Sequence, residues 1–124
     1  MAKSQFRSVK KTSGRKYLTF RKKRLSDLGA DPALTHIGKS RVRVKRVRGG
    51  NIKRSLLSKE KVLVNKGGAT LSLEIQGVAQ NPANVNYTRR NIITKGCIVK
   101  TAQGDVRITS RPGQSGDLSG VFVQ

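Results

Sequence analysis

The side chains with catalytic potential are few in this sequence, and they are widely spaced. His36 is the only histidine, so neither a metal cluster nor a histidine-based triad can draw on a second one. Cys97 is the only cysteine, and we interpret it as a small buried residue because its only candidate base, His36, lies far away in sequence. The six carboxylates occur singly, so paired-carboxylate chemistry has no local support. We therefore expect no enzyme, no metal and no cofactor.

One short stretch has the ending of a nucleotide-binding loop. Gly38-Lys39-Ser40 matches the last part of the phosphate-binding motif, but that motif requires a glycine where this sequence has Ala33. The pattern indicates neither a strand before the stretch nor a helix after it. We interpret it as a plain loop whose lysine can contact a phosphate, and we expect no small-molecule substrate.

Positive charge is the dominant feature of the sequence. The 124 residues carry 27 lysines and arginines against 6 acids, which gives a formal net charge of +21. Such an excess destabilises an isolated compact chain by self-repulsion, so it indicates a polyanionic partner. No apolar run approaches the roughly 18 residues that span a bilayer, and no apolar segment follows the basic N-terminus as in a secretory signal. We expect a cytoplasmic protein that makes no contact with a membrane.

The cations are concentrated in the first part of the chain. Residues 1–54 hold 18 basic and 2 acidic side chains, whereas residues 55–124 hold 9 and 4. The first 24 residues contain ten cations, no acid and no sustained apolar period, which is typical of an arm without a core of its own. We expect the basic arm and a following loop at residues 1–40 and a folded domain at residues 41–124.

Three aromatic residues are interleaved with the cations of this arm. Phe6, Tyr17 and Phe20 can either stack on unpaired bases or pack against the folded domain. A short helix is predicted around residues 20–28, where Gly29 and the proline after it end the pattern.

Residues 41–48 alternate between valine and basic side chains. This period of two predicts a strand with one buried face and one basic face, and a bulge late in the strand would keep its last valine on the buried face. Successive cations on the basic face lie about 6.7 Å apart, a spacing that lets one strand contact neighbouring phosphates. Because Gly49 and Gly50 tolerate a tight reversal, the chain is expected to return as a hairpin through residues 52–57.

Further short strands follow at intervals marked by turns. They are predicted at residues 61–65, 70–76, 92–101, 106–110 and 118–123. The polar stretch 80–90 is expected to place Arg89 and Arg90 on a loop or at the start of a strand. We therefore expect a mainly β chain with a small antiparallel β-barrel or sandwich-like domain, an extended basic N-terminal arm and at most one short helix.

Three sequence motifs indicate the protein family more specifically than the charge pattern does. They are Val47-Arg48-Gly49-Gly50-Asn51, then Asn81-Pro82-Ala83-Asn84 with Arg89-Arg90-Asn91-Ile92-Ile93-Thr94-Lys95-Gly96, and Ile108-Thr109-Ser110-Arg111-Pro112-Gly113-Gln114. They resemble the archaeal and eukaryotic e-type family of small-subunit ribosomal protein eight, and the compact length resembles the archaeal form. The resemblance covers almost the whole chain. It implies a β-barrel-like domain and a basic N-terminal segment that are buried in small-subunit rRNA, next to other ribosomal proteins, as structural components in support of translation.

The charge pattern and the resemblance together define a set of candidate RNA-binding residues. In the arm they are Arg7, Lys10, Lys11, Arg15, Lys16, Arg21, Lys22, Lys23 and Arg24, and beyond it Arg41, Arg43, Lys45, Arg46, Arg48, Lys53, Arg54, Arg89, Arg90, Lys95 and Arg111. We expect those beyond the arm, apart from Arg46, to lie on one RNA-facing side. The residues expected to form the turns that aim them are Gly49, Gly50, Asn81, Pro82, Pro112 and Gly113.

Two other functions share this charge pattern. A transient ribosome-assembly factor would leave the finished particle, and a protein that compacts nucleic acids without specificity would bind duplex DNA as well as folded rRNA. The sequence alone leaves both open.

Overall fold

The structure of the chain, a computed structural model, describes residues 3–123 and divides the chain into two compact units after Pro32. Residues 33–40 thus belong to the second unit, whereas the sequence suggested a boundary after residue 40. The physical reason lies in β1 (Thr35–His36), which pairs with two strands of the second unit. Thr35 is fully buried, and its hydroxyl donates a hydrogen bond of 2.7 Å to the carbonyl oxygen of Leu56.

The first unit contains little regular secondary structure. It has one 3₁₀ turn, η1 (Leu25–Asp27), and two isolated β-bridges that join Ser4 to Leu28 and Lys10 to Lys16. The helix predicted around residues 20–28 is therefore reduced to a single turn. Leu25, which would anchor the apolar face of a longer helix, is exposed.

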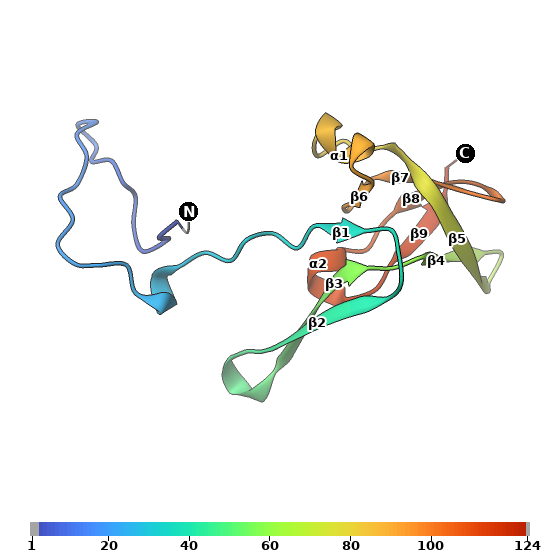
Figure 1. Cartoon of the computed structure of the whole chain (residues 1–124), viewed down its shortest axis with the longest axis horizontal. Coiled ribbons are helices and arrows are strands. Elements are labelled where there is room, and N and C mark those ends of the chain that lie inside the picture. Colours follow the sequence, from blue (N-terminus) through green and yellow to red (C-terminus); the bar gives the residue numbers. More distant parts are fainter. Residues whose placement is uncertain (1–2, 124) are drawn as a thin grey trace. The chain divides into compact units, whose positions relative to one another are not determined.

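The second unit is built mainly from strands (Figure 1). A closed barrel is formed, in order, by β4 (Lys61–Lys66), β5 (Ala69–Gln80), β7 (Ile98–Thr101), β8 (Gly104–Ile108) and β9 (Ser119–Phe122). A four-stranded sheet has the order β2 (Arg41–Arg46), β3 (Ile52–Ser58), β1 and β6 (Ile92–Ile93). The mainly β class and the barrel are confirmed. The barrel closes through β4 and β9, which run parallel, while its other neighbouring strands are antiparallel.

Alternating side chains build the core of the barrel, as the period of two predicts. In β4, Val62 and Val64 are fully buried while Leu63 between them is exposed. Cys97 is also fully buried in this core, and desolvation raises the pKa of its thiol. This burial confirms the prediction of a small buried residue at Cys97.

Short helices are more numerous than expected. The second unit contains α1 (Val85–Arg89), α2 (Pro112–Ser115) and the 3₁₀ turn η2 (Arg48–Gly50), where at most one helix was predicted. In the polar stretch, the Asn84 side chain caps α1 by accepting a hydrogen bond of 2.9 Å from the Asn86 backbone nitrogen. Pro112 occupies the beginning of α2, where its fixed φ favours a helical start.

The β2–β3 hairpin forms as predicted, but its burial differs from the expectation. Val42 and Val44 are 42% and 61% exposed, so β2 has no buried face. β2 is the edge strand of its sheet, and Figure 1 shows the hairpin extending beyond the barrel, so no second layer covers the valines. The register irregularity lies at the start of the strand, between Arg41 and Val42, rather than late in it.

Candidate nucleic-acid interface

The β2–β3 hairpin carries the densest set of exposed cations in the second unit. Lys45 lies directly opposite Lys53, and Arg43 lies opposite Ser55. Residues directly opposite each other in an antiparallel pair share a face, and like charges in that position repel. The hairpin contains no acid to offset this repulsion. The arrangement therefore favours an external polyanion on the face that carries Arg43, Lys45 and Lys53, which we call the lysine face.

Of the remaining hairpin cations, Arg46 and Arg54 lie on the opposite face and Arg48 lies at the tip, while Arg41 is at the start of β2, paired with Ser58. Arg54 is opposite Val44, and Arg46 is opposite Ile52. At the tip, Gly49 and Gly50 both have a φ of 74°, and η2 holds Arg48 on this turn. The hairpin thus presents cations on both faces and at its end.

A second set of cations lies where α1 ends. Arg89 is the last residue of α1, Arg90 follows it, and Lys95 lies between β6 and β7. These segments are joined through Asn81, which is 3% exposed. Its amide nitrogen donates to the carbonyl oxygen of Ile92 at 2.9 Å, and its side-chain oxygen accepts hydrogen bonds from Ala83 N and Thr94 Oγ1. The turn predicted at Asn81 and Pro82 is thus a buried polar junction.

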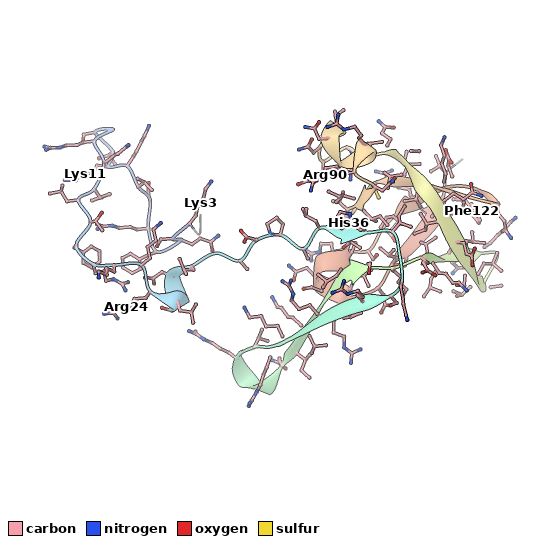
Figure 2. The ribbon with its side chains drawn as sticks, viewed as in Figure 1. Lys3, Lys11, Arg24, His36, Arg90 and Phe122 are labelled. Atoms are coloured by element: carbon pink, nitrogen blue, oxygen red, sulfur yellow. The ribbon has the colours of Figure 1, made fainter. Side chains whose placement is uncertain are left out.

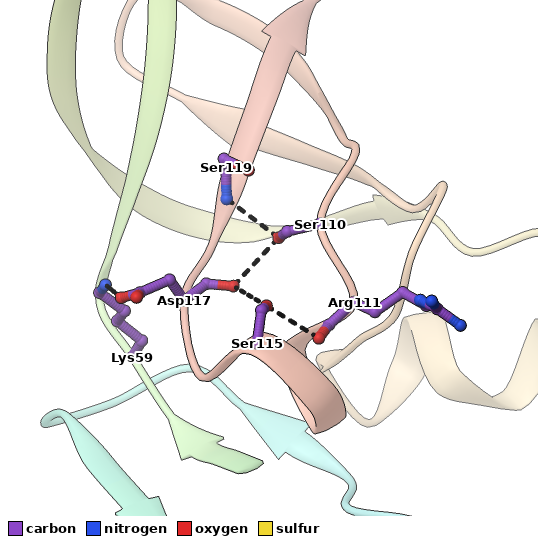
Figure 3. Close-up of polar contacts among 6 residues, drawn as sticks. All are labelled: Lys59, Ser110, Arg111, Ser115, Asp117 and Ser119. Carbon is purple, nitrogen blue, oxygen red and sulfur yellow. Dashed lines mark hydrogen bonds and ion pairs between the residues drawn. The ribbon is translucent and has the colours of Figure 1, made fainter. Parts of the chain in front are cut away.

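Arg111 is positioned by a network of hydrogen bonds around α2 (Figure 3). Ser115 Oγ donates to the Arg111 carbonyl oxygen at 3.0 Å, and Ser110 Oγ donates to the Asp117 carbonyl oxygen at 3.0 Å. Lys59 Nζ pairs with Asp117 Oδ1 at 2.8 Å, which anchors this loop to the end of β3. Pro112 and Gly113, which were expected in a turn, form the first half of α2. Figure 3 shows the Arg111 side chain pointing away from the network.

The candidate cations of the second unit include two separate groups, one on the β2–β3 hairpin and one at the end of α1. The hairpin tip and α1 lie at opposite ends of this unit in Figure 1, and Figure 2 shows Arg90 at the α1 end. The structure brings Arg89 and Arg90 together and keeps Lys45 beside Lys53, but it separates these two pairs.

The first unit carries most of its cations on its surface. The exposed ones among the candidate residues are Arg7, Lys10, Lys11, Arg15, Lys16, Lys22, Lys23 and Arg24, of which Lys11 and Arg24 are labelled in Figure 2. Arg21 differs because it is partly buried and pairs with Asp27, with 3.0 Å between Nη2 and Oδ2.

Sequence reasoning missed the residues that position these cations. Asn81 was identified only as a turn residue, and Ser110, Ser115 and Asp117 were not singled out. The Asn81-Pro82 pair signals a turn, but no local pattern shows that the amide will be buried between two segments.

The described part of the chain contains neither a cluster of metal ligands nor a helix that could span a membrane. Within residues 3–123, no group of three or more histidine, cysteine, aspartate or glutamate side chains could hold a metal ion. Over the same residues, no helix has the length and apolar character that crossing a membrane requires.

Comparison with known proteins adds a further finding. The family model described as "Ribosomal protein S8e" matches residues 4–123. The chain is 43% identical to the small ribosomal subunit protein eS8 of Methanobrevibacter smithii over 125 residues, which cover 99% of this chain and 100% of that protein. It is 44% identical to the protein of the same name from Nanoarchaeum equitans, over 97% of this chain and 96% of that protein.

Proposed function

Because the chain belongs to the ribosomal protein S8e family, as its motifs indicated, we propose that it is a structural constituent of the small ribosomal subunit in the cytoplasm. In this role it binds and stabilises folded rRNA through phosphate contacts and thereby supports translation. Neighbouring ribosomal proteins are its other partners. The observation that carries the proposal is the acid-free hairpin, in which exposed cations stand directly opposite each other.

The distribution of the acids supports this function. Asp117 and Glu74 pair with Lys59 and Lys61, which are not among the candidate RNA-binding residues. The hairpin and the end of α1 contain no acid that could offset their positive charge, so this charge is available to an external partner. Counterion release from phosphates makes such binding strongly dependent on salt. With roughly eight phosphate contacts, the logarithm of the affinity should fall with the logarithm of salt at a slope of about −6 to −7.

Charge reversal at the end of α1 tests one part of this interface. The double variant Arg89→Glu/Arg90→Glu should bind folded small-subunit rRNA about 25-fold more weakly at physiological salt, because each lost phosphate contact costs about 5-fold through counterion release. The salt slope should also become shallower by about 1.5 to 2. A filter-binding titration over a range of salt concentrations measures both quantities.

A matched control separates contact from overall charge. The variant Lys66→Glu/Arg107→Glu makes the same change of charge at exposed positions of β4 and β8 on the barrel. It should keep most of the affinity and the original slope. If the two double variants lose affinity equally, Arg89 and Arg90 are not phosphate contacts.

A further inference from the structure

The first unit contains a cluster of three aromatic rings and two guanidinium groups. The Arg7 Cζ atom lies 4.2 Å from the centre of the Tyr17 ring and 5.0 Å from that of Phe20. The Arg21 Cζ atom lies 4.7 Å from the centre of the Phe6 ring and 5.5 Å from that of Phe20. All four distances are within the range of cation–π attraction. We call these five residues the aromatic–arginine cluster.

The rings of the cluster remain accessible. Phe6, Tyr17 and Phe20 are 54%, 41% and 65% exposed, and none of them belongs to the hydrophobic core of the barrel. The five side chains line an open cavity of about 180 Å³. This volume is below the 300 to 1,000 Å³ that is common for drug-sized ligands, so the cavity suits one small flat group.

One hydrogen-bond donor in the cluster is left without a partner. Arg21 lines the cavity, and its Nη2 atom is held by Asp27 Oδ2 at 3.0 Å. Its Nη1 atom is buried and has no hydrogen-bond partner. A buried donor without an acceptor is costly, but because Nη1 is covered by other groups, a ligand has to displace them before it can accept a hydrogen bond from this atom. The ion pair with Asp27 fixes the guanidinium in the orientation that such a ligand would meet.

We propose that this cavity takes one unpaired RNA base, which stacks on the aromatic–arginine cluster and, by displacing the groups that cover Arg21 Nη1, accepts a hydrogen bond from that atom. Aromatic rings and arginine planes are the surfaces on which splayed-out bases stack. Lys22, which also lines the cavity, can meet the phosphate of the same nucleotide. The inference rests on the proposed rRNA-binding function and adds a specific site to it.

The chemistry of the cavity favours a base over the simpler anions. A phosphate has no flat face that could stack on the three exposed rings. A base has both a flat face and acceptor atoms on its edge. A single donor cannot distinguish one base from another, because every base offers at least one acceptor. The site therefore binds an unpaired base whatever its identity.

The test uses the full-length chain and two RNA hairpins that differ in one feature. One hairpin contains a single bulged 2-aminopurine, and the other contains the same base paired within the stem. We expect about 5- to 100-fold tighter binding of the bulged hairpin, the range that one stacked base contributes, and a change in 2-aminopurine fluorescence only with that hairpin. Mononucleotide is then added in excess. It would block a site for free nucleotides, but it would not block a site that needs the RNA strand.

Variants then assign the preference to the cluster. Tyr17→Ala and Phe20→Ala should each reduce the preference for the bulged hairpin and leave the affinity for the paired hairpin nearly unchanged. Arg21→Lys keeps the charge but removes Nη1, so it should reduce the preference as well. The control is Leu25→Ala, which removes a large exposed apolar side chain of the same unit outside the cavity and should change neither affinity.

A measurement on the unmodified protein guards against variants that fail to fold. Nuclear Overhauser contacts between the bulged base and the rings of Tyr17 or Phe20 are expected in the wild-type complex. If both hairpins bind equally with a steep salt slope and no such contacts, the base site is refuted and the phosphate-binding function stands. If neither hairpin nor folded rRNA binds, both proposals fail.

Discussion

Replacing Arg43, Lys45 and Lys53 together with glutamate should weaken binding to folded small-subunit rRNA by about 100- to 1,000-fold at physiological salt. Three lost phosphate contacts at about 5-fold each account for roughly 100-fold, and repulsion between the new carboxylates and the phosphates adds to this loss. The triple variant replaces the opposed pair Lys45–Lys53 with an opposed pair of glutamates, so the repulsion within that pair is about unchanged, while the lower net charge reduces the self-repulsion of the whole chain, and the variant should fold about as stably as the wild type. The loss of affinity would then come from the missing contacts and not from unfolding.

The control for this variant changes the same amount of charge on the barrel. Lys61, Lys66 and Lys100 are exposed lysines of β4 and β7, and their joint replacement by glutamate should cost far less affinity. Circular dichroism checks that both variants are folded, and filter binding to rRNA compares them. Equal losses in the two variants would mean that the hairpin contributes only general charge and that the lysine face is not a contact surface.

Replacing Gly120 with alanine should prevent the barrel from closing normally. A Cβ atom at this buried position would lie 2.6 Å from Val106 Cγ1 and 2.7 Å from the carbonyl oxygen of Arg107. Real Cβ atoms essentially never approach other atoms this closely, and the Arg107 oxygen belongs to the backbone of the paired strand β8, so it cannot move aside cheaply. The free energy of unfolding should fall by about 3 kcal/mol, the upper part of the range for overpacking. For a domain of this size, that corresponds to a decrease in Tm of about 12 to 24 °C.

Gly77 in β5 provides the matched control for this prediction. A Cβ atom there would meet only Asn91 Oδ1, at 3.9 Å, which is an ordinary contact. Gly77→Ala should therefore change the free energy of unfolding by less than about 1 kcal/mol, with a tendency to stabilise because alanine restricts the unfolded chain. Thermal unfolding followed by circular dichroism measures both variants. If Gly120→Ala unfolds at the temperature of the wild type, the close contact between β8 and β9 is not as described.

The parts of the fold that the sequence predicts are those determined by neighbouring residues. The turn at Gly49 and Gly50 and the alternation of Val62 and Val64 with polar or exposed positions depend on local backbone preferences and on strand pleating. These patterns were enough to predict the hairpin, most barrel strands and the mainly β class, but the strand predicted at residues 92–101 is divided into β6 and β7, which belong to different sheets.

The parts that could not be predicted depend on residues far apart in sequence. Thr35 joins the second unit through a hydrogen bond to Leu56, and no pattern around Thr35 indicates that partner. The exposure of Val42 has a similar cause, because the alternation of the strand predicts two faces but not whether another layer covers one of them.

For the candidate interface, too, the sequence predicts some features and not others. The number and types of its cations follow directly from the sequence, whereas their grouping does not. The hairpin tip and α1 lie at opposite ends of the second unit because β2 and β6 are the two edges of the four-stranded sheet and α1 directly precedes β6. Similarly, the aromatic residues of the arm suggested stacking, but the pairing of Arg21 with Asp27 and the unpartnered Nη1 atom required the structure.

We propose that the protein is a permanent part of the small ribosomal subunit, and sedimentation of the tagged protein from a native lysate is the decisive test. Small-subunit fractions are collected and washed at high salt, and the protein is measured in the washed particles and in the released material. We predict that it stays with the washed small subunits, because contacts from several regions of one chain have to break together before it leaves. Release into the free fraction, or its presence only in precursor particles, would contradict this claim and indicate a transient assembly factor or a general binder of polyanions.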